Sequence, residues 1–143
     1  MSRQARPAID ETIEIARPIE TVWDTVTDWE RAAEWLPNVS ECRGAAATEV
    51  GIELPFRYQG QPAKAVIEQV RSPEHLVIRR PNGPVDAIFT YDLAATPDGT
   101  SARLRAELRA AKGIGLVTWL LGKFLARTDR DQLQRLKGVV ERP

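Results

Sequence analysis

The fold of this chain is decided by the stretch Ile19-Glu-Thr-Val-Trp-Asp-Thr-Val-Thr-Asp-Trp-Glu-Arg-Ala-Ala-Glu-Trp-Leu-Pro-Asn-Val39. It contains three of the four tryptophans of the chain, Trp23, Trp29 and Trp35. Tryptophans at this density usually line a core or an apolar cavity, because each one buries a large hydrophobic surface. We expect Trp23 and Trp35 to be buried, and Trp29, which lies between acidic residues at a helix start, to be more exposed.

Two short amphipathic helices are predicted within this stretch. The first begins at Pro18, where the missing proline N–H costs nothing, and its apolar residues recur at helical spacing. The second begins after Asp28, a favourable N-cap residue, and ends at Pro37. An alternating segment over residues 8–16 precedes the pair and indicates a first strand.

A period of two replaces the helical period between residues 39 and 110. Turn residues interrupt it at regular intervals, for example at Pro97-Asp98-Gly99. The last run alternates cleanly, with Leu104 and Ala106 on one face and charged residues on the other. Regularly spaced turns of this kind indicate an antiparallel meander with one solvated face. We therefore predict six strands in this region and seven in the whole sheet.

One long helix is predicted over residues 112–140. Residues 114–125 are apolar nearly all round, whereas the second half has only a narrow apolar seam. A helix that is apolar on all sides is normally surrounded, and one small sheet covers only one side of it. We expect the two short helices, a partner subunit or a ligand to cover the rest.

This order of elements resembles the helix-grip fold of the START-related, birch-pollen-allergen-like and polyketide cyclase superfamily (SRPBCC), in its polyketide cyclase/dehydrase-like branch. The resemblance covers essentially the whole chain and is carried by residues 17–24, 28–37, 98–100 and 133–137. It implies an α+β fold in which a seven-stranded antiparallel curved sheet wraps round the long C-terminal helix and leaves an apolar cavity. The superfamily includes polyketide cyclases, aromatases, lipid and quinone carriers and a subunit-like protein of carbon monoxide dehydrogenase, so the resemblance does not fix a chemistry.

Composition limits the class of protein further. At 143 residues the chain forms one domain with its own core, so we assign residues 1–143 to a single helix-grip domain and expect residues 1–7 to be a disordered tail. The 20 basic and 20 acidic residues balance, so no overall field favours nucleic acid or an anionic membrane. Cys42 is the single cysteine, which suits a reducing compartment. Without a signal-like or membrane-spanning run, we expect a cytoplasmic protein.

The sequence offers few candidate catalytic side chains. His75, the single histidine, lies in a Pro-Glu-His turn, where we expect it to be solvated and without a partner. No metal-ligand set is apparent, and no cofactor is expected. Tyr58 and Tyr91 are weak catalytic candidates, because their hydroxyls would lie in an apolar wall. Arg57 and Arg80 are the nearest groups that could polarise a carbonyl, although Arg57 alternates outward.

Large aromatic residues lie on the apolar faces of the predicted strands and of the long helix. Small alanines, such as Ala63, Ala65, Ala87 and Ala106, accompany them on the strands, which favours a cavity over a filled core. The predicted ligand-binding residues are Trp23, Trp35, Phe56, Tyr58, Phe89, Tyr91, Trp119, Leu120 and Phe124.

The sequence therefore predicts a protein that binds a small hydrophobic or aromatic ligand, of lipid, quinone or polyketide type, in an internal cavity. Two alternatives stay open. One is a polyketide cyclase or dehydrase that acts on an enolisable polyketone. The other is a docking or carrier subunit that uses the apolar residues 114–125. The expected partner is a small apolar molecule, with neither nucleic acid nor a membrane span, and the protein is a monomer or a homodimer.

Overall fold

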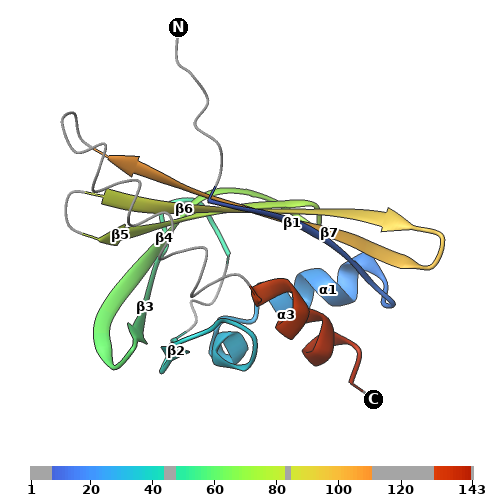
Figure 1. The fold of residues 1–143 in the computed structure, drawn as a ribbon, viewed down its shortest axis with the longest axis horizontal. Helices are drawn as coiled ribbons and strands as arrows, with labels where there is room; N and C mark the ends of the chain where they lie inside the picture. Colours follow the sequence, from blue (N-terminus) through green and yellow to red (C-terminus); the bar gives the residue numbers. More distant parts are fainter. Residues whose placement is uncertain (1–7, 44–47, 83–84, 111–130, 143) are drawn as a thin grey trace, which may run out of the picture.

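A seven-stranded antiparallel sheet forms one layer of the protein, and helices cover one of its faces (Figure 1). The computed structural model describes residues 8–43, 48–82, 85–110 and 131–142. The strands are β1 (Ile9–Ile15), β2 (Val39–Ser40), β3 (Glu53–Tyr58), β4 (Gln61–Arg71), β5 (His75–Asn82), β6 (Val85–Thr96) and β7 (Gly99–Ala110). The described helices are α1 (Ile19–Val26), the 3-10 helix η1 (Trp29–Glu34) and α3 (Gln132–Val140).

The sheet order is β1-β7-β6-β5-β4-β3-β2. Strands β2 to β7 lie in the sheet in their order along the chain. The first strand, β1, lies at the edge beyond β7 and pairs with it, with Ile13 opposite Ala102. Every pairing is antiparallel. This arrangement confirms the predicted seven-stranded antiparallel curled sheet. Pro55 lies inside β3, which pairs with β4 on one side and, within the described part of the chain, with the two-residue β2 on the other. The strand is therefore close to an edge, as a proline requires.

The second short helix differs from the prediction. It is a 3-10 helix, and Asp28 makes no side-chain capping bond to it. With about three residues per turn, a 3-10 helix places positions i, i+3 and i+6 on one side. Trp29, Ala32 and Trp35 lie on that side and are only 4%, 1% and 1% exposed. The expectation that Trp29 is more exposed is therefore wrong, because it rested on the acidic residues beside Trp29 at the helix start, whereas the 3-10 winding turns Trp29 to the same buried side as Trp35.

The core lies between the concave face of the sheet and the helices. Alternation along β7 turns Leu104 and Ala106 inward, and both are fully buried. Val22 of α1 and Leu136 of α3 pack in the same cluster, and both are fully buried as well. Burying such side chains contributes about 1.5–3 kcal/mol each, so these helices are held mainly by their apolar faces.

The C-terminal helix is tied to the end of β1. Glu141 accepts a hydrogen bond from the Ala16 amide at 2.8 Å, and its carbonyl accepts one from Arg17 at 2.9 Å. Lys137 donates to the Glu14 carbonyl at 2.8 Å. Of the helix predicted over residues 112–140, the structure describes α3, which begins at Gln132. Residues 111–130 lie outside the described residues, as does the predicted tail over residues 1–7.

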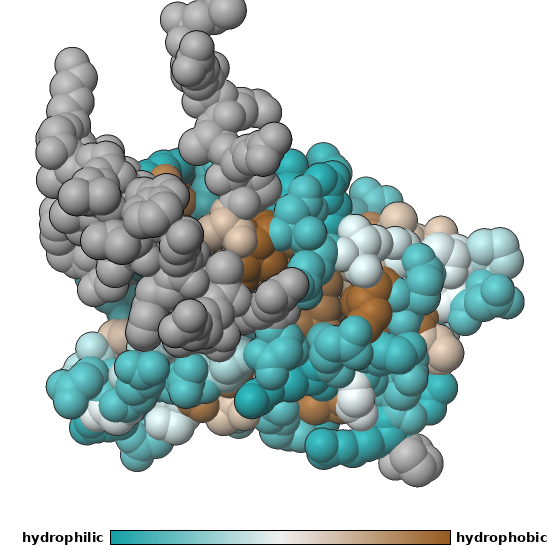
Figure 2. Space-filling model, viewed as in Figure 1, coloured by the Kyte–Doolittle hydropathy of each residue, from teal (hydrophilic) through white to brown (hydrophobic). Residues whose placement is uncertain are grey.

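The described surface in the view of Figure 2 is mostly hydrophilic, with apolar side chains gathered toward its middle. Among the described helices, none has the length and apolar character needed to cross a membrane.

Candidate functional site

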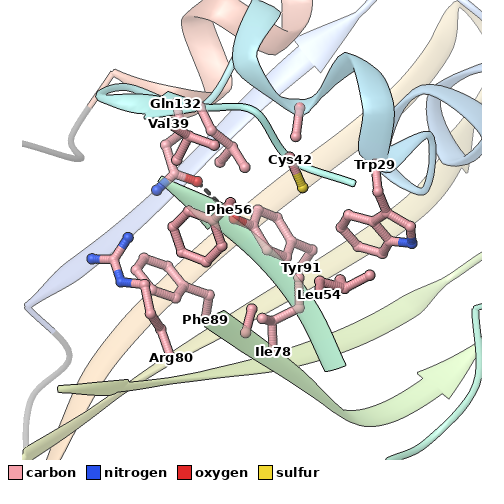
Figure 3. A pocket seen from close by; sticks show the side chains of 13 residues that line it. Trp29, Val39, Cys42, Leu54, Phe56, Ile78, Arg80, Phe89, Tyr91 and Gln132 are labelled. Atoms are coloured by element: carbon pink, nitrogen blue, oxygen red, sulfur yellow. Dashed lines mark hydrogen bonds between the residues drawn. The ribbon is translucent and has the colours of Figure 1, made fainter. Parts of the chain in front are cut away.

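An apolar pocket lies between the concave face of the sheet, η1 and the start of α3 (Figure 3). The cavity volume is about 50 Å³, several times the roughly 10–15 Å³ that one water needs. Its described lining residues are Trp29, Ala32, Leu36, Val39, Cys42, Leu54, Phe56, Ala65, Ile78, Arg80, Phe89, Tyr91 and Gln132.

Strand alternation explains how the sheet supplies this wall. Ile78 and Phe89 are opposite each other on β5 and β6, and residues two positions away on the same strands, Arg80 and Tyr91, face the same side. Phe56 reaches the pocket from β3. Together with Ala65 of β4, these residues make four neighbouring strands present one continuous, mainly apolar surface.

Tyr91 links the sheet to both Gln132 and Trp35. Its hydroxyl donates a hydrogen bond to Oε1 of Gln132 at 2.7 Å, and both residues are buried. Its ring and that of Trp35 pack in a T-shaped arrangement, with centroids 5.8 Å apart and planes at 81°. The bond joins the sheet to α3 across the pocket wall, and its donor points at Gln132, so the Tyr91 hydroxyl serves to position α3.

Arg80 brings a cation to the apolar wall. Its guanidinium carbon lies 4.5 Å from the ring centroid of Tyr58 and 5.0 Å from that of Phe89. Such cation–π contacts hold a guanidinium in a fixed orientation and offset part of its desolvation. The pocket therefore has a cationic group at one end, while Trp29 lies at the other (Figure 3).

The opposite end of the pocket is apolar except for two groups. The Trp29 indole N–H donates to Oγ1 of Thr48 at 3.2 Å, which fixes the ring in the wall. Cys42 is half-buried beside it, and burial raises the pKa of its thiol. A thiol with a raised pKa stays protonated at neutral pH and is a poor nucleophile, so Cys42 acts here as a small apolar side chain.

The predicted ligand-binding residues fall into three groups. Phe56, Phe89 and Tyr91 line the pocket. Trp23 and Trp35 are buried in the core without lining the pocket, and Tyr58 lies against Arg80. The third group, Trp119, Leu120 and Phe124, lies outside the described residues. Among the alanines, Ala65 lines the pocket, whereas Ala106 is buried without lining it.

Sequence reasoning missed several lining residues. Trp29 was not expected there, because its acidic neighbours Asp28 and Glu30 indicated an exposed position. Gln132 follows Asp131 in a charged segment, and no periodic signal separates it from exposed residues, although it is 1% exposed. Strand alternation could have found Ile78 and Arg80, since both lie in register with Leu76 on β5.

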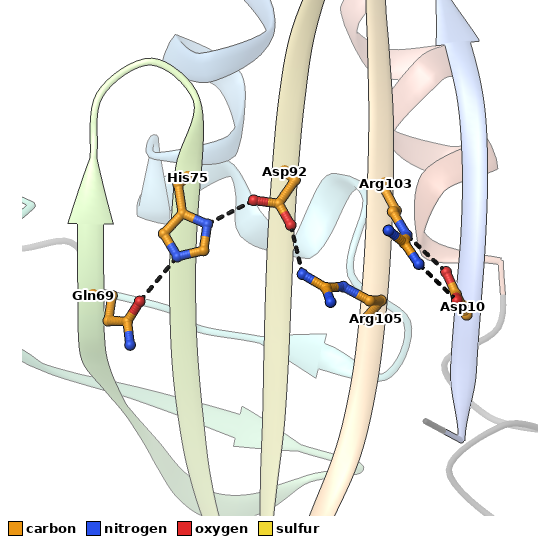
Figure 4. A network of polar contacts seen from close by, with 6 residues as sticks. All are labelled: Asp10, Gln69, His75, Asp92, Arg103 and Arg105. Carbon is orange, nitrogen blue, oxygen red and sulfur yellow. Dashed lines mark hydrogen bonds and ion pairs between the residues drawn. The ribbon is translucent and has the colours of Figure 1, made fainter. Parts of the chain in front are cut away.

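His75 departs from its expected environment. It begins β5, and its Nδ1 lies 2.6 Å from Oδ1 of Asp92, while Nε2 lies 3.0 Å from Oε1 of Gln69 (Figure 4). Arg105 donates to the other Asp92 oxygen at 2.9 Å. Burial acts to raise the pKa of the Asp92 carboxyl, but the hydrogen bonds from His75 and Arg105 outweigh it and leave that pKa below its usual value. The expectation of a solvated histidine without a partner is wrong, because adjacent strands bring these polar residues together.

This polar network lies on the convex face of the sheet. Residues 75 and 92 are directly opposite each other, and the next pair, Leu76 and Tyr91, faces the core. Alternation therefore turns His75 away from the pocket. Among residues 8–43, 48–82, 85–110 and 131–142, no group of His, Cys, Asp and Glu side chains is arranged to hold a metal ion.

Comparison with known proteins assigns the chain to a family. No curated protein matches it. Its fold is similar to that of protein MLL2253 from Mesorhizobium loti, with a TM-score of 0.71 and 16% identity over 93% of this chain and 96% of that one. Protein NE0264 from Nitrosomonas europaea gives a TM-score of 0.71 at 19% identity, over 94% of this chain and 95% of that one. Protein CV1439 from Chromobacterium violaceum gives 0.66 at 21% identity, over 94% and 98%. A family described as "Polyketide cyclase / dehydrase and lipid transport" matches residues 6–141, and the chain therefore belongs to this family, as its resemblance to the SRPBCC superfamily implied.

Proposed function

We propose that this protein binds a small hydrophobic or aromatic molecule in the pocket between the concave face of the sheet and the helices. The observation that carries the proposal is the lining itself: aromatic and aliphatic side chains form most of the described wall, and few polar groups interrupt it. Concave, mainly apolar sites with a few fixed polar groups are typical of small-molecule binding. The membership of a family that includes lipid transport supports the same function.

A polyketide cyclase or dehydrase activity is the second candidate. Arg80 favours it, because a guanidinium in an apolar wall can stabilise negative charge that develops on a carbonyl oxygen. Among the described lining residues there is no carboxylate and no histidine to act as a general base. The Tyr91 hydroxyl already donates to Gln132. Binding is therefore the better supported function, while the docking alternative rests on residues 114–125, which lie outside the described residues.

The proposal is tested by filling the pocket. Ala65 lines it from β4, and Ala63, on the same face of the same strand, does not. The probe is 2-naphthamide, a neutral aromatic molecule, and the readout is the melting temperature as the probe concentration increases. A ligand that binds only the native state raises that temperature in a concentration-dependent way.

We expect the wild type and Ala63→Leu to show this rise and Ala65→Leu to lose it. Affinities from isothermal titration then locate the effect in binding rather than in unfolding. A wild type that shows no response, or an Ala65→Leu variant that responds like Ala63→Leu, would contradict binding in this pocket.

A further inference from the structure

Gln132 is a buried polar side chain whose amide nitrogen has no partner among the described residues. The residue begins α3, is 1% exposed and lines the pocket. The buried hydroxyls of Thr25 and Thr100 differ from it, because each donates to a backbone carbonyl, at 3.1 and 2.8 Å. Within the same part of the chain, the amide of Gln132 is bonded through its oxygen alone.

The hydroxyl of Tyr91 determines which end of this amide is left over. It donates to Oε1 of Gln132 at 2.7 Å, so the amide oxygen is turned toward the sheet. The nitrogen carries the two N–H donors of the amide, and Figure 3 shows it on the side of the amide away from Tyr91. Gln132 therefore offers hydrogen-bond donors to a ligand in the pocket, and not an acceptor.

The burial of Gln132 makes this donor selective. A buried donor that is left without an acceptor costs the desolvation of the group, which corresponds to about fivefold or more in a binding constant. A ligand with an oxygen at this point removes that cost, whereas a hydrocarbon ligand of the same shape retains it. Sites built around a buried hydrogen-bonding group reject analogues that lack the matching atom for this reason.

We infer that the pocket takes an apolar or aromatic molecule with a neutral carbonyl oxygen, which accepts a hydrogen bond from the Gln132 amide. This inference rests on the proposed function and names the class of ligand. The donor is uncharged, which favours a neutral oxygen, because a neutral amide does not offset the desolvation of a charged one.

The described wall also favours a carbonyl over a hydroxyl. A hydroxyl brings a proton of its own, which needs an acceptor when it is buried. Among the described lining residues there is no carboxylate and no histidine to accept that proton. A carbonyl oxygen only accepts hydrogen bonds, so it matches the donors of Gln132 without leaving a proton unpaired.

The test compares 2-acetylnaphthalene with 2-isopropenylnaphthalene. The two probes have nearly the same shape, but the carbonyl oxygen of the first is a methylene carbon in the second. The alkene is the more hydrophobic of the two, so a purely apolar pocket would bind it more tightly. We expect the wild type to bind the ketone at least about fivefold more tightly in equilibrium dialysis, because only the ketone pairs the buried donor.

Two variants examine the amide itself. Gln132→Met keeps the length of the side chain and removes its donors, so the preference for the ketone should disappear. The alkene should still bind within about threefold of its wild-type affinity, which also shows that the pocket of this variant is formed. Tyr91→Phe keeps Gln132 but removes the bond that orients its amide, and its preference for the ketone should lie between those of the wild type and Gln132→Met.

Gln134→Met is the matched control. Gln134 lies two positions further along α3, is exposed and is not among the lining residues of the pocket. The substitution is chemically the same as in Gln132→Met, and the variant should retain the full preference of the wild type for the ketone.

Each contrary result has a separate meaning. If the wild type binds the alkene as tightly as the ketone, or if Gln132→Met retains the preference for the ketone, the carbonyl inference is overturned and ligand binding stands. Tighter binding of 1-(2-naphthyl)ethanol than of 2-acetylnaphthalene overturns it too, in favour of a hydroxyl group. If the wild type binds neither the ketone nor the alkene, the proposed function fails and the inference falls with it.

Discussion

Gly99 is the position where the structure makes the sharpest prediction about stability. It begins β7 with a φ of +153°, and a Cβ added there would lie far inside van der Waals contact of the Ile15 carbonyl and 3.0 Å from the Arg17 amide nitrogen. Both neighbours are backbone atoms, so no side-chain rotation relieves the overlap. Replacement by alanine must displace the end of β1, which also holds the C-terminus of α3 through Arg17 and Glu141.

The size of the effect follows from two terms. Holding a residue other than glycine in a sparsely populated backbone region costs about 1–3 kcal/mol, and each backbone hydrogen bond lost at the displaced end of β1 costs about 1 kcal/mol. We expect Gly99→Ala to lower the free energy of unfolding by about 2–4 kcal/mol, measured as a shift of the urea midpoint at constant slope.

Two other glycines separate these terms. Gly51 has a φ of +88° but open space around its Cβ position, so Gly51→Ala should cost about 1–2 kcal/mol from strain alone. Gly138 lies exposed in α3 with nothing near its Cβ position, and Gly138→Ala should stabilise the protein by about 0.5–1 kcal/mol. If Gly99→Ala proves no more damaging than Gly51→Ala, the close approach of β1 to the β6–β7 turn is refuted.

Three further predictions concern the pocket and the convex face. Trp29→Ala should lower the free energy of unfolding by about 3–5 kcal/mol in urea titrations, because a fully buried ring is removed. Tyr91→Phe should lower it by about 1–3 kcal/mol, because the buried Gln132 oxygen loses its donor; circular dichroism checks that the fold is kept. Asp92 has a lowered pKa in the native state, so its contribution to stability is present above its unfolded pKa and is lost as pH falls through the native one. The free energy of unfolding should therefore fall less on acidification in Asp92→Asn than in the wild type. Asp24 is exposed, and Asp24→Asn is the control.

Distinct results would contradict each of these. A Trp29→Ala variant within about 1 kcal/mol of the wild type would place the ring at the surface. Tyr91→Phe with unchanged stability would show that its bond to Gln132 is absent in solution. An acid transition that is the same in Asp92→Asn as in the wild type would show that the network of Figure 4 adds no stability at neutral pH.

The sheet could be predicted from the sequence because its signals are local. Alternation along Leu104 and Ala106 fixes which side of β7 is buried, and the turn at Pro97-Asp98-Gly99 fixes the pairing of β6 with β7. Both depend only on the two-residue period of a strand and on turn geometry. The same alternation indicated that Phe56, Phe89 and Tyr91 share one face, which is the face that forms the pocket wall.

The environment of His75 was decided only by tertiary structure. Its partners Gln69 and Asp92 come from two other strands, and Arg105, which donates to Asp92, comes from a third. No spacing in the sequence links these residues. The turn residues before His75 suggested solvent, whereas the pairing of β5 with β6 supplied a carboxylate opposite it.

What the sequence determined by itself is the antiparallel meander and its apolar face, because periodicity and turns act over a few residues. What only the tertiary structure decided is the winding of η1, which turns Trp29 inward, and the meeting of Arg80, Tyr91 and Gln132 at one pocket. These depend on contacts between residues far apart in the chain: Gln132 lies 41 positions after Tyr91. The local sequence pattern predicts on which face of a strand a side chain lies, but the packing between elements decides which side chains come together at the pocket.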